Sequence, residues 1–205
     1  MAPKYIIEHM EEGVSDWVRL EYLQIVRDVG SDNLWLAGVK PGLEMPKEFV
    51  EAGVQHTTKD VLEFGQLDPN FDKSRVCLLD PSATEEFSPE DRDRFDYFLF
   101  GGILGDHPPR DRTGELRNKG FVGRRLGPIQ MTTDTAVRVT KMICDQQKKL
   151  DDIDFVDFPE LKFNKNESTE MPFRYVKDSQ GRPIMPQGMF ELIKADSQKS
   201  LDDLL

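Results

Sequence analysis

The chain has 205 residues, enough for one compact domain or for one domain with a substantial tail. It contains 38% hydrophobic and 32% charged residues, no apolar run long enough to span a membrane and no secretory leader, so we expect a cytoplasmic protein without a membrane partner. Its 27 basic and 38 acidic side chains give a formal net charge of −11. This charge disfavours RNA or DNA as a direct partner and favours a basic one.

Strands and helices are expected to alternate through residues 1–150. Between Ser15, a capping residue, and Gly30, a terminating one, apolar residues recur at helical spacing. The predicted elements are a strand over 4–9, a helix over 15–30, a strand over 33–39, short helices near 46–52 and 59–64, a strand over 75–79, a helix start at 88–91, a strand from 97, a polar and weakly helical segment over 112–119, a strand from 121 and a helix from 132 to about 149. This alternation predicts a parallel sheet with helices on both faces.

The most distinctive segment is a glycine-rich turn that follows the apolar run Tyr97–Phe100. The run predicts a strand buried on both faces, and the glycines within Gly101–Gly105 would let the backbone bend or a ligand lie against it. Pro108-Pro109 then prevent an immediate helix, so the turn cannot offer helix amides to a pyrophosphate. A dinucleotide or nucleoside triphosphate is therefore disfavoured. A loop that only closes a core strand is the alternative interpretation.

The sequence changes character beyond about Leu150. The expected pieces are strands within 155–163 broken at Pro159, a polar segment over 164–170, an extended piece over 171–176 and a helix near 187–194. The four prolines of this part suggest that residues 151–205 form an extension that wraps over the core and lies on the substrate side, and not a second globular domain.

Three loops are expected to leave the carboxyl ends of buried strands, at Asp80-Pro81, 101–109 and 126–132. Ligands of open α/β sheets bind beyond those ends, so these loops predict a small-molecule site, although they indicate no reaction. The histidines are too scattered to predict a metal site, and Cys77 and Cys144 are expected to be buried free thiols.

Five segments carry longer motifs: Ile6–Glu12, Phe100–Arg112, Gln130–Ala136, Phe163–Tyr175 and Ser200–Leu205. They closely resemble the SPOUT-class (SpoU-TrmD) protein arginine methyltransferases of fungi, and the resemblance extends over nearly the whole chain. It implies an α/β fold with a parallel sheet flanked by helices and a C-terminal trefoil knot. It also implies S-adenosylmethionine as cofactor, a monomer, and the transfer of one methyl group to an arginine of the KH-domain protein of the small ribosomal subunit.

The same resemblance assigns the three loops to the cofactor. Adenosine would lie against Leu79, Asp80 and Pro81. The ribose and methionine parts would approach Phe100, Gly101, Gly102, Leu104 and Gly105. The adenine pocket would be completed by Leu126, Gly127, Gln130, Met131, Thr132 and Ala136. As an alternative, Leu79, Phe100 and Ala136 could be ordinary core residues.

Arginine methylation makes its own demand, because a guanidinium keeps its proton in proteins and is a poor nucleophile. Carboxylates paired to its N–H groups can both aim it and balance its charge. The acidic candidates are Glu8, Glu11, Glu12, Asp106, Glu167 and Glu170. We favour Asp106, Glu8 and Glu11 as catalytic residues because they sit at strand ends, where side chains can point at the cofactor, and His107 as a candidate general base. Each acid could instead be solvated, His107 could fix its loop, and Asp111 could pair with the arginines beside it.

Two other functions stay open beside a protein arginine methyltransferase. An RNA methyltransferase of the same fold would need a basic face, which the net charge disfavours. A ribosome-assembly factor could bind the cofactor without transferring a methyl group.

Overall fold

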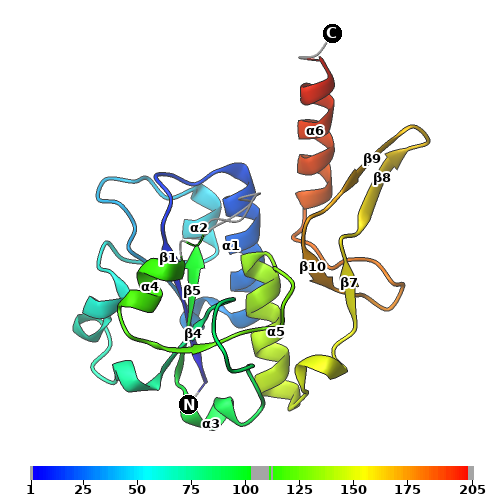
Figure 1. Ribbon diagram of the computed structural model, residues 1–205. Coiled ribbons are helices and arrows are strands. Elements are labelled where there is room, and N and C mark those ends of the chain that lie inside the picture. The colour runs from blue at the N-terminus through cyan, green and yellow to red at the C-terminus, as the bar shows by residue number, and fades with distance from the viewer. Residues whose placement is uncertain (1, 103–110, 112, 203–205) are drawn as a thin grey trace.

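The computed structural model describes residues 2–102, 111 and 113–202, and shows an α/β core with a smaller C-terminal part beside it (Figure 1). Single-turn or short 3-10 helices are labelled η. The elements are β1 (Lys4–His9), α1 (Asp16–Val29), η1 (Ser31–Asn33), β2 (Leu34–Ala37), α2 (Lys47–Glu51), β3 (Gln55–His56), η2 (Val61–Gln66), η3 (Lys73–Arg75), β4 (Val76–Leu79), α3 (Asp91–Arg94), β5 (Tyr97–Gly102), α4 (Thr113–Asn118), β6 (Val122–Arg124), α5 (Thr133–Gln146), η4 (Leu150–Asp152), β7 (Phe155–Asp157), β8 (Glu160–Asn164), β9 (Glu167–Glu170), β10 (Arg174–Val176) and α6 (Met189–Asp202).

Six strands form one parallel sheet in the order β3-β2-β1-β5-β4-β6. This confirms the predicted parallel α/β architecture. The chain first adds β2 and β3 on one side of β1 and then crosses to the other side, so β1 and β5 lie at the centre. Glu8 is opposite Gly101 in the register of these two strands. Their carboxyl ends therefore open at the same edge of the sheet.

Helices cover both faces of this sheet because successive strand residues point to opposite sides. Tyr5 and Ile7 of β1 pack in the cluster that also contains the buried side chains of α1 and α5. Ile6 packs in the second cluster, with η2 and Leu116 of α4. At the start of α1, Ser15 Oγ accepts a hydrogen bond from the Val18 N–H at 3.2 Å, as predicted for its cap.

The C-terminal part forms two small antiparallel sheets and one helix. β10 pairs with β7, the β8–β9 hairpin projects beside α6, and α6 rises away from the core (Figure 1). This part has its own apolar cluster, which reaches the core through Trp17 and Leu20 of α1. The division of the chain at residue 150 stays a prediction.

Several local expectations were wrong. The polar segment over 164–170 supplies β9, where Glu160 faces Glu170 and Leu161 faces Thr169 across the hairpin. α5 ends at Gln146, near the start of a run of exposed polar residues, and α6 extends to Asp202 instead of ending near residue 194. The short strand β3 was not foreseen. The predicted knot depends on the path of residues 103–110 and 112, which lie outside the described residues, and stays a prediction.

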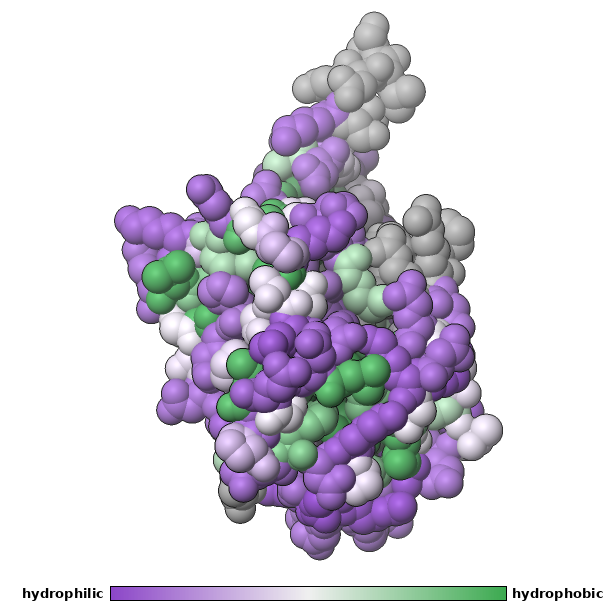
Figure 2. Space-filling model, turned by 90° about the vertical axis from the view of Figure 1, so that its left-hand side faces the viewer, coloured by the Kyte–Doolittle hydropathy of each residue, from purple (hydrophilic) through white to green (hydrophobic). Residues whose placement is uncertain are grey.

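The face of the molecule in Figure 2 is largely hydrophilic. Figure 2 views the side that is on the left in Figure 1 and shows apolar patches framed by hydrophilic residues. The exposed large hydrophobic side chains include Leu62 and Leu67. Scattered exposed leucines are usual for a globular protein. None of the helices in the described ranges combines the length and hydropathy that a membrane crossing requires.

Candidate active site

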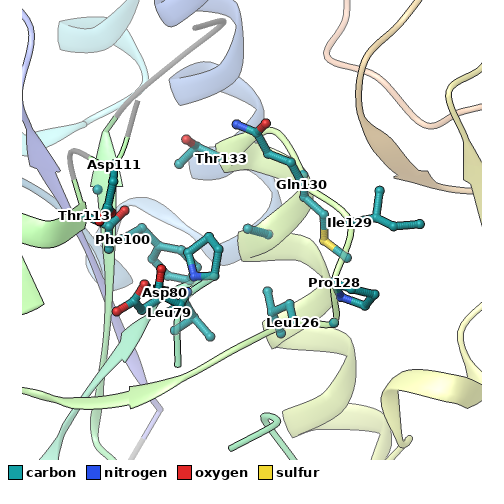
Figure 3. A pocket seen from close by; sticks show the side chains of 16 residues that line it. Leu79, Asp80, Phe100, Asp111, Thr113, Leu126, Pro128, Ile129, Gln130 and Thr133 are labelled. Atoms are coloured by element: carbon teal, nitrogen blue, oxygen red, sulfur yellow. Dashed lines mark hydrogen bonds between the residues drawn. The ribbon is translucent and has the colours of Figure 1, made fainter. Parts of the chain in front are cut away.

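A cavity of about 370 Å³ lies at the carboxyl ends of β4 and β5, a volume typical of small-molecule sites. Its lining residues are Leu79, Asp80, Pro81, Ser82, Phe100, Gly101, Asp111, Thr113, Leu126, Gly127, Pro128, Ile129, Gln130, Met131, Thr133 and Ala136. Figure 3 shows Leu79, Asp80 and Phe100 facing Leu126 and Pro128 across the cavity. The cavity is therefore built between two strand ends and the loop over 126–131.

The chemistry of this lining is mainly apolar, with backbone exposed at glycines. Phe100 ends the apolar part of β5, and Thr133 and Ala136 bring the first turn of α5 to the cavity. Gly127 has a φ of +78°, a left-handed conformation that favours glycine. A Cβ at Gly127 would also lie 3.2 Å from Leu150 Cδ2. The loop can follow this path only with a glycine at position 127 or with strain.

One charged network closes the β4 side of the cavity. Asp80, only 2% exposed, accepts hydrogen bonds from Arg117 Nε and Nη2 at 2.6 and 2.8 Å, and from the Ser82 N–H at 2.9 Å. Arg117 also donates to both carboxylate oxygens of Asp111 at 3.0 and 3.1 Å. These bonds raise the pKa of Arg117 and lower that of Asp111. Arg117 thus joins α4 to two loops. Asp111 pairs here with Arg117, while the arginines beside Asp111 lie outside the described residues.

Most of the predicted cofactor residues meet at this cavity. Those that line it are Leu79, Asp80, Pro81, Phe100, Gly101, Leu126, Gly127, Gln130, Met131 and Ala136. Leu104 and Gly105 lie outside the described residues. Gly102 does not line the cavity, because it packs beneath Tyr22, whose hydroxyl would lie 2.7 Å from an added Cβ. Thr132 is also absent from the lining, since its hydroxyl bonds to that of Thr135 at 2.8 Å within the protein.

Six further residues line the cavity that were not among the predicted cofactor residues: Ser82, Asp111, Thr113, Pro128, Ile129 and Thr133. Pro128 and Ile129 belong to the predicted loop over 126–132, and Asp111 was considered only as an ion-pair partner. Ser82, Pro128, Ile129 and Thr133 directly follow or lie between predicted site residues, so chain adjacency could have found them. Asp111 and Thr113 could not be found in this way, because they come to the cavity through the bonds of Arg117 in α4 to Asp111 and to the distant Asp80.

Glu8 lies at a second cavity, of about 360 Å³, whose lining residues are Glu8, His9, Met10, Glu115, Leu116 and Lys119. The Glu8 side chain is nearly buried, and its Oε2 accepts a hydrogen bond from the Val61 N–H at 3.1 Å. Burial raises the pKa of Glu8 to about 7, although Lys119 opposes the shift. Glu8 faces Gly101 in the sheet register and α4 contributes to both cavities, so the two cavities are neighbours.

The other candidate acids are less well placed or not described. Glu11 is half-buried in the turn after β1. Asp106 and His107 lie outside the described residues, so their catalytic roles stay predictions. His9 is fixed structurally: its Nε2 lies 3.0 Å from the Gly13 carbonyl and its Nδ1 lies 2.9 Å from the Tyr22 hydroxyl. Cys77 and Cys144 are buried free thiols, as predicted.

Comparison with known proteins decides the family. Residues 4–200 match the family described as protein arginine N-methyltransferase SFM1-like. The chain belongs to this family. It is 55% identical over 212 residues to the protein arginine N-methyltransferase SFM1 of Saccharomyces cerevisiae, and the alignment covers 98% of this chain and 99% of the yeast protein. A crystal structure of the yeast arginine methyltransferase SFM1 complexed with SAM superposes with a TM-score of 0.92 at 53% identity, over 97% of this chain and 92% of the other.

A more distant structure supports the fold alone. The dual specific Trm10 of Thermococcus kodakaraensis aligns with a TM-score of 0.51 and 20% identity, over 73% of this chain and 96% of that chain. SFM1 and Trm10 are both SPOUT methyltransferases, which confirms the predicted fold class apart from the knot. Membership of the SFM1-like family likewise confirms the predicted enzyme class, a protein arginine N-methyltransferase.

Proposed function

We propose that the cavity at the ends of β4 and β5 is the S-adenosylmethionine site of this protein arginine N-methyltransferase. The observation that carries the proposal is the meeting of the carboxyl ends of β4 and β5 with the loop over 126–131 around one cavity of suitable size. The lining fits the cofactor, because its apolar side chains can hold an adenine ring while the backbone at Gly101 and Gly127 admits close approach. S-adenosylmethionine, when bound, supplies a methyl group on a positively charged sulfur.

The chain's own residues would hold the adenosine from two sides. Leu79 and Phe100 offer apolar surface from the strand ends, and Leu126 and Met131 offer it from the loop over 126–131. Arg117 is engaged by Asp80 and Asp111, so its positive charge is neutralised before a cationic cofactor arrives. This arrangement avoids repulsion between an arginine and the sulfonium.

We assign Glu8 to the substrate side of the reaction. Its buried carboxyl, with a pKa raised to about 7, lies on the strand beside Gly101 of the cofactor cavity. In its ionised form it can accept N–H groups of a guanidinium, neutralise the charge and orient the nitrogen. Lys119 is held by Asp60 at 3.0 Å, so part of its charge is balanced and it competes less with an incoming arginine.

The finer assignments follow the resemblance to fungal enzymes. We propose that the substrate is the KH-domain protein of the small ribosomal subunit, that one methyl group is added in the cytoplasm, and that the enzyme acts as a monomer. A basic ribosomal-protein loop is a suitable partner for a chain of net charge −11. We place the extension over 151–205 on the substrate side, because its hairpin and α6 project beside the core (Figure 1).

Labelled S-adenosylmethionine tests the function directly. Incubated with the enzyme and with ribosomes from cells that lack it, the label should enter one small-subunit protein as monomethylarginine, as read by mass spectrometry. Glu8→Gln, which can still accept the Val61 N–H, should lower kcat/KM for the protein substrate by about 100-fold. Wild-type activity should rise as pH passes about 7, where Glu8 ionises, and the variant should lose that rise.

Glu12→Gln is the matched control, because Glu12 is exposed in the turn that follows the same strand. It should leave activity within twofold of the wild type, by the usual size of exposed pairs, which is about 1 kcal/mol or less. Label found in ribosomal RNA would reject the proposed substrate class. A Glu8→Gln enzyme with the full rate and an unchanged pH profile would remove Glu8 from the reaction.

A further inference from the structure

The C-terminal extension contacts the wall of the cofactor cavity at one residue of β10. The Arg174 N–H donates a hydrogen bond to the Gln130 carbonyl at 2.9 Å, and Arg174 forms a parallel bridge with Met131. Gln130 and Met131 both line the cavity. The outer side of the loop over 126–131 is therefore bonded to the backbone of the extension, while its inner side faces the cavity.

The Arg174 side chain is itself fixed by two neighbours on β7. Its Nε and Nη2 donate to the two carboxylate oxygens of Asp157 at 2.6 and 2.9 Å, a fork-to-fork pair. Its guanidinium lies over the Phe155 ring, 4.7 Å from the ring centroid. The side chain is only 18% exposed, and the two residues of the pair face each other in the β7–β10 register. Bidentate pairing and stacking both demand arginine at this position.

The third nitrogen of the same guanidinium approaches the cavity loop. A Cβ built at Gly127 would lie 3.8 Å from Arg174 Nη1 and 3.2 Å from Leu150 Cδ2. Arg174 therefore packs against the outer side of a glycine whose inner side lines the cavity. Together, the backbone bond at Gln130 and this packing restrain the loop at two places.

We propose that Arg174 is a positioning residue for the methyl donor: held by Asp157 and Phe155, it fixes the loop over 126–131 in the form that binds adenosine. The inference rests on the proposed cofactor site. It makes the extension part of that site, although no residue of 151–205 lines the cavity among the described residues. Arg174 acts through the loop and does not touch the reacting atoms.

Calorimetry with S-adenosylmethionine and with methylthioadenosine, which lacks the amino-acid arm, tests this role. Arg174→Ala keeps the backbone N–H but loses the fork, and should weaken both ligands by the same factor, about fivefold to tenfold. Arg174→Lys and Asp157→Asn should give similar losses, because neither keeps a bidentate pair. The double variant with Arg174→Ala and Asp157→Asn should bind no worse than Arg174→Ala. At saturating cofactor, kcat should stay within about twofold of wild type.

Arg182→Ala is the matched control. Arg182 also belongs to the extension and pairs with a carboxylate, Asp178, but it is 68% exposed and does not contact the loop. It should bind both ligands as the wild type does. Arg174 variants that bind both ligands with wild-type affinity would overturn the inference, whether or not they melt at a lower temperature. A wild-type chain that binds neither ligand would instead reject the proposed cofactor site itself.

Discussion

Two elements that form walls of the cavity each carry a buried aspartate, and the two carboxyls have opposite surroundings: one faces a cation and the other faces a second acid. Asp80, 2% exposed, is neutralised by the guanidinium of Arg117. Asp134, 0% exposed, follows Thr133 of the α5 wall and interacts with Glu21 of α1, another fully buried acid. A buried carboxylate can keep its charge only with a cation, and two neighbouring buried acids can coexist only by holding protons. One wall is therefore stabilised by an ion pair. The other contains two acids whose protonation makes the stability of the fold depend on pH.

The largest expected effect comes from removing the cation of the first wall. Among the residues that the structure describes, Arg117→Ala leaves the buried Asp80 side chain with only the Ser82 N–H, so the free energy of unfolding should fall by about 2–3 kcal/mol. This is the lower part of the range for buried pairs, because Arg117 is 37% exposed. Affinity for S-adenosylmethionine should fall as well, since Asp80 lines its cavity. Urea unfolding and calorimetry measure the two losses.

Arg75→Ala is the control for this prediction. Arg75 makes a bidentate pair with Asp96, but both partners are more than a third exposed, so the loss should stay below about 1 kcal/mol. Equal losses of stability for the two variants would show that the burial of Asp80 does not increase the cost of removing its arginine partner.

A smaller effect is expected on the opposing loop. Gly127→Ala places a Cβ at positive φ and 3.2 Å from Leu150, which costs about 1–2 kcal/mol and displaces the loop. We expect roughly tenfold weaker binding of S-adenosylmethionine by calorimetry. Gly42→Ala has the same sign of φ, +81°, with nothing within 4 Å of its Cβ. It should lower the melting temperature but leave cofactor affinity unchanged, and a similar affinity loss there would make the effect on binding indirect.

The difference between the two walls was only partly visible in the sequence. Strand patterns and glycine-rich turns were sufficient to predict the strand ends at Leu79 and Phe100 and the loop over 126–131, because those signals are local. The pairing of Asp80 with Arg117 joins residues 37 positions apart, and the contact of Glu21 with Asp134 joins two helices. Periodicity cannot show which charged side chains become partners across a fold. The resemblance to fungal enzymes placed residues around the cofactor, but it did not indicate which carboxyls hold protons.

The second wall gives the smallest expected effect, a change in the pH dependence of stability. Burial and the facing carboxyl raise the pKa of Glu21, and burial raises the pKa of Asp134. Burial is the largest cause of the raised pKa for both acids, while Thr132 and the charge of Arg138 oppose part of the shift at Asp134. The unfolded chain releases these protons near its ordinary pKa of about 4, whereas the folded chain keeps them. Stability should therefore fall as pH rises above about 4, until it passes the raised pKa values of the folded state.

Glu21→Gln removes one of the two acids while keeping the shape of the side chain. At pH 7.5 the variant should be more stable than wild type by about 1 kcal/mol, or roughly 2–4 °C in melting temperature. At pH 5 the increase in stability over wild type should be smaller. At that pH, ionisation of Glu21 in the unfolded wild-type chain lowers the free energy of unfolding by less than it does at pH 7.5. Glu8, with a pKa raised to about 7, also titrates in this range, but both proteins share it, so the difference between the two melting curves isolates Glu21. Glu191→Gln, on the exposed side of α6, should show no such difference. A Glu21→Gln chain whose stability rises equally at both pH values, or falls at pH 7.5, would contradict this prediction. It would mean that Glu21 and Asp134 are already ionised in the folded wild type and that other groups balance their charge.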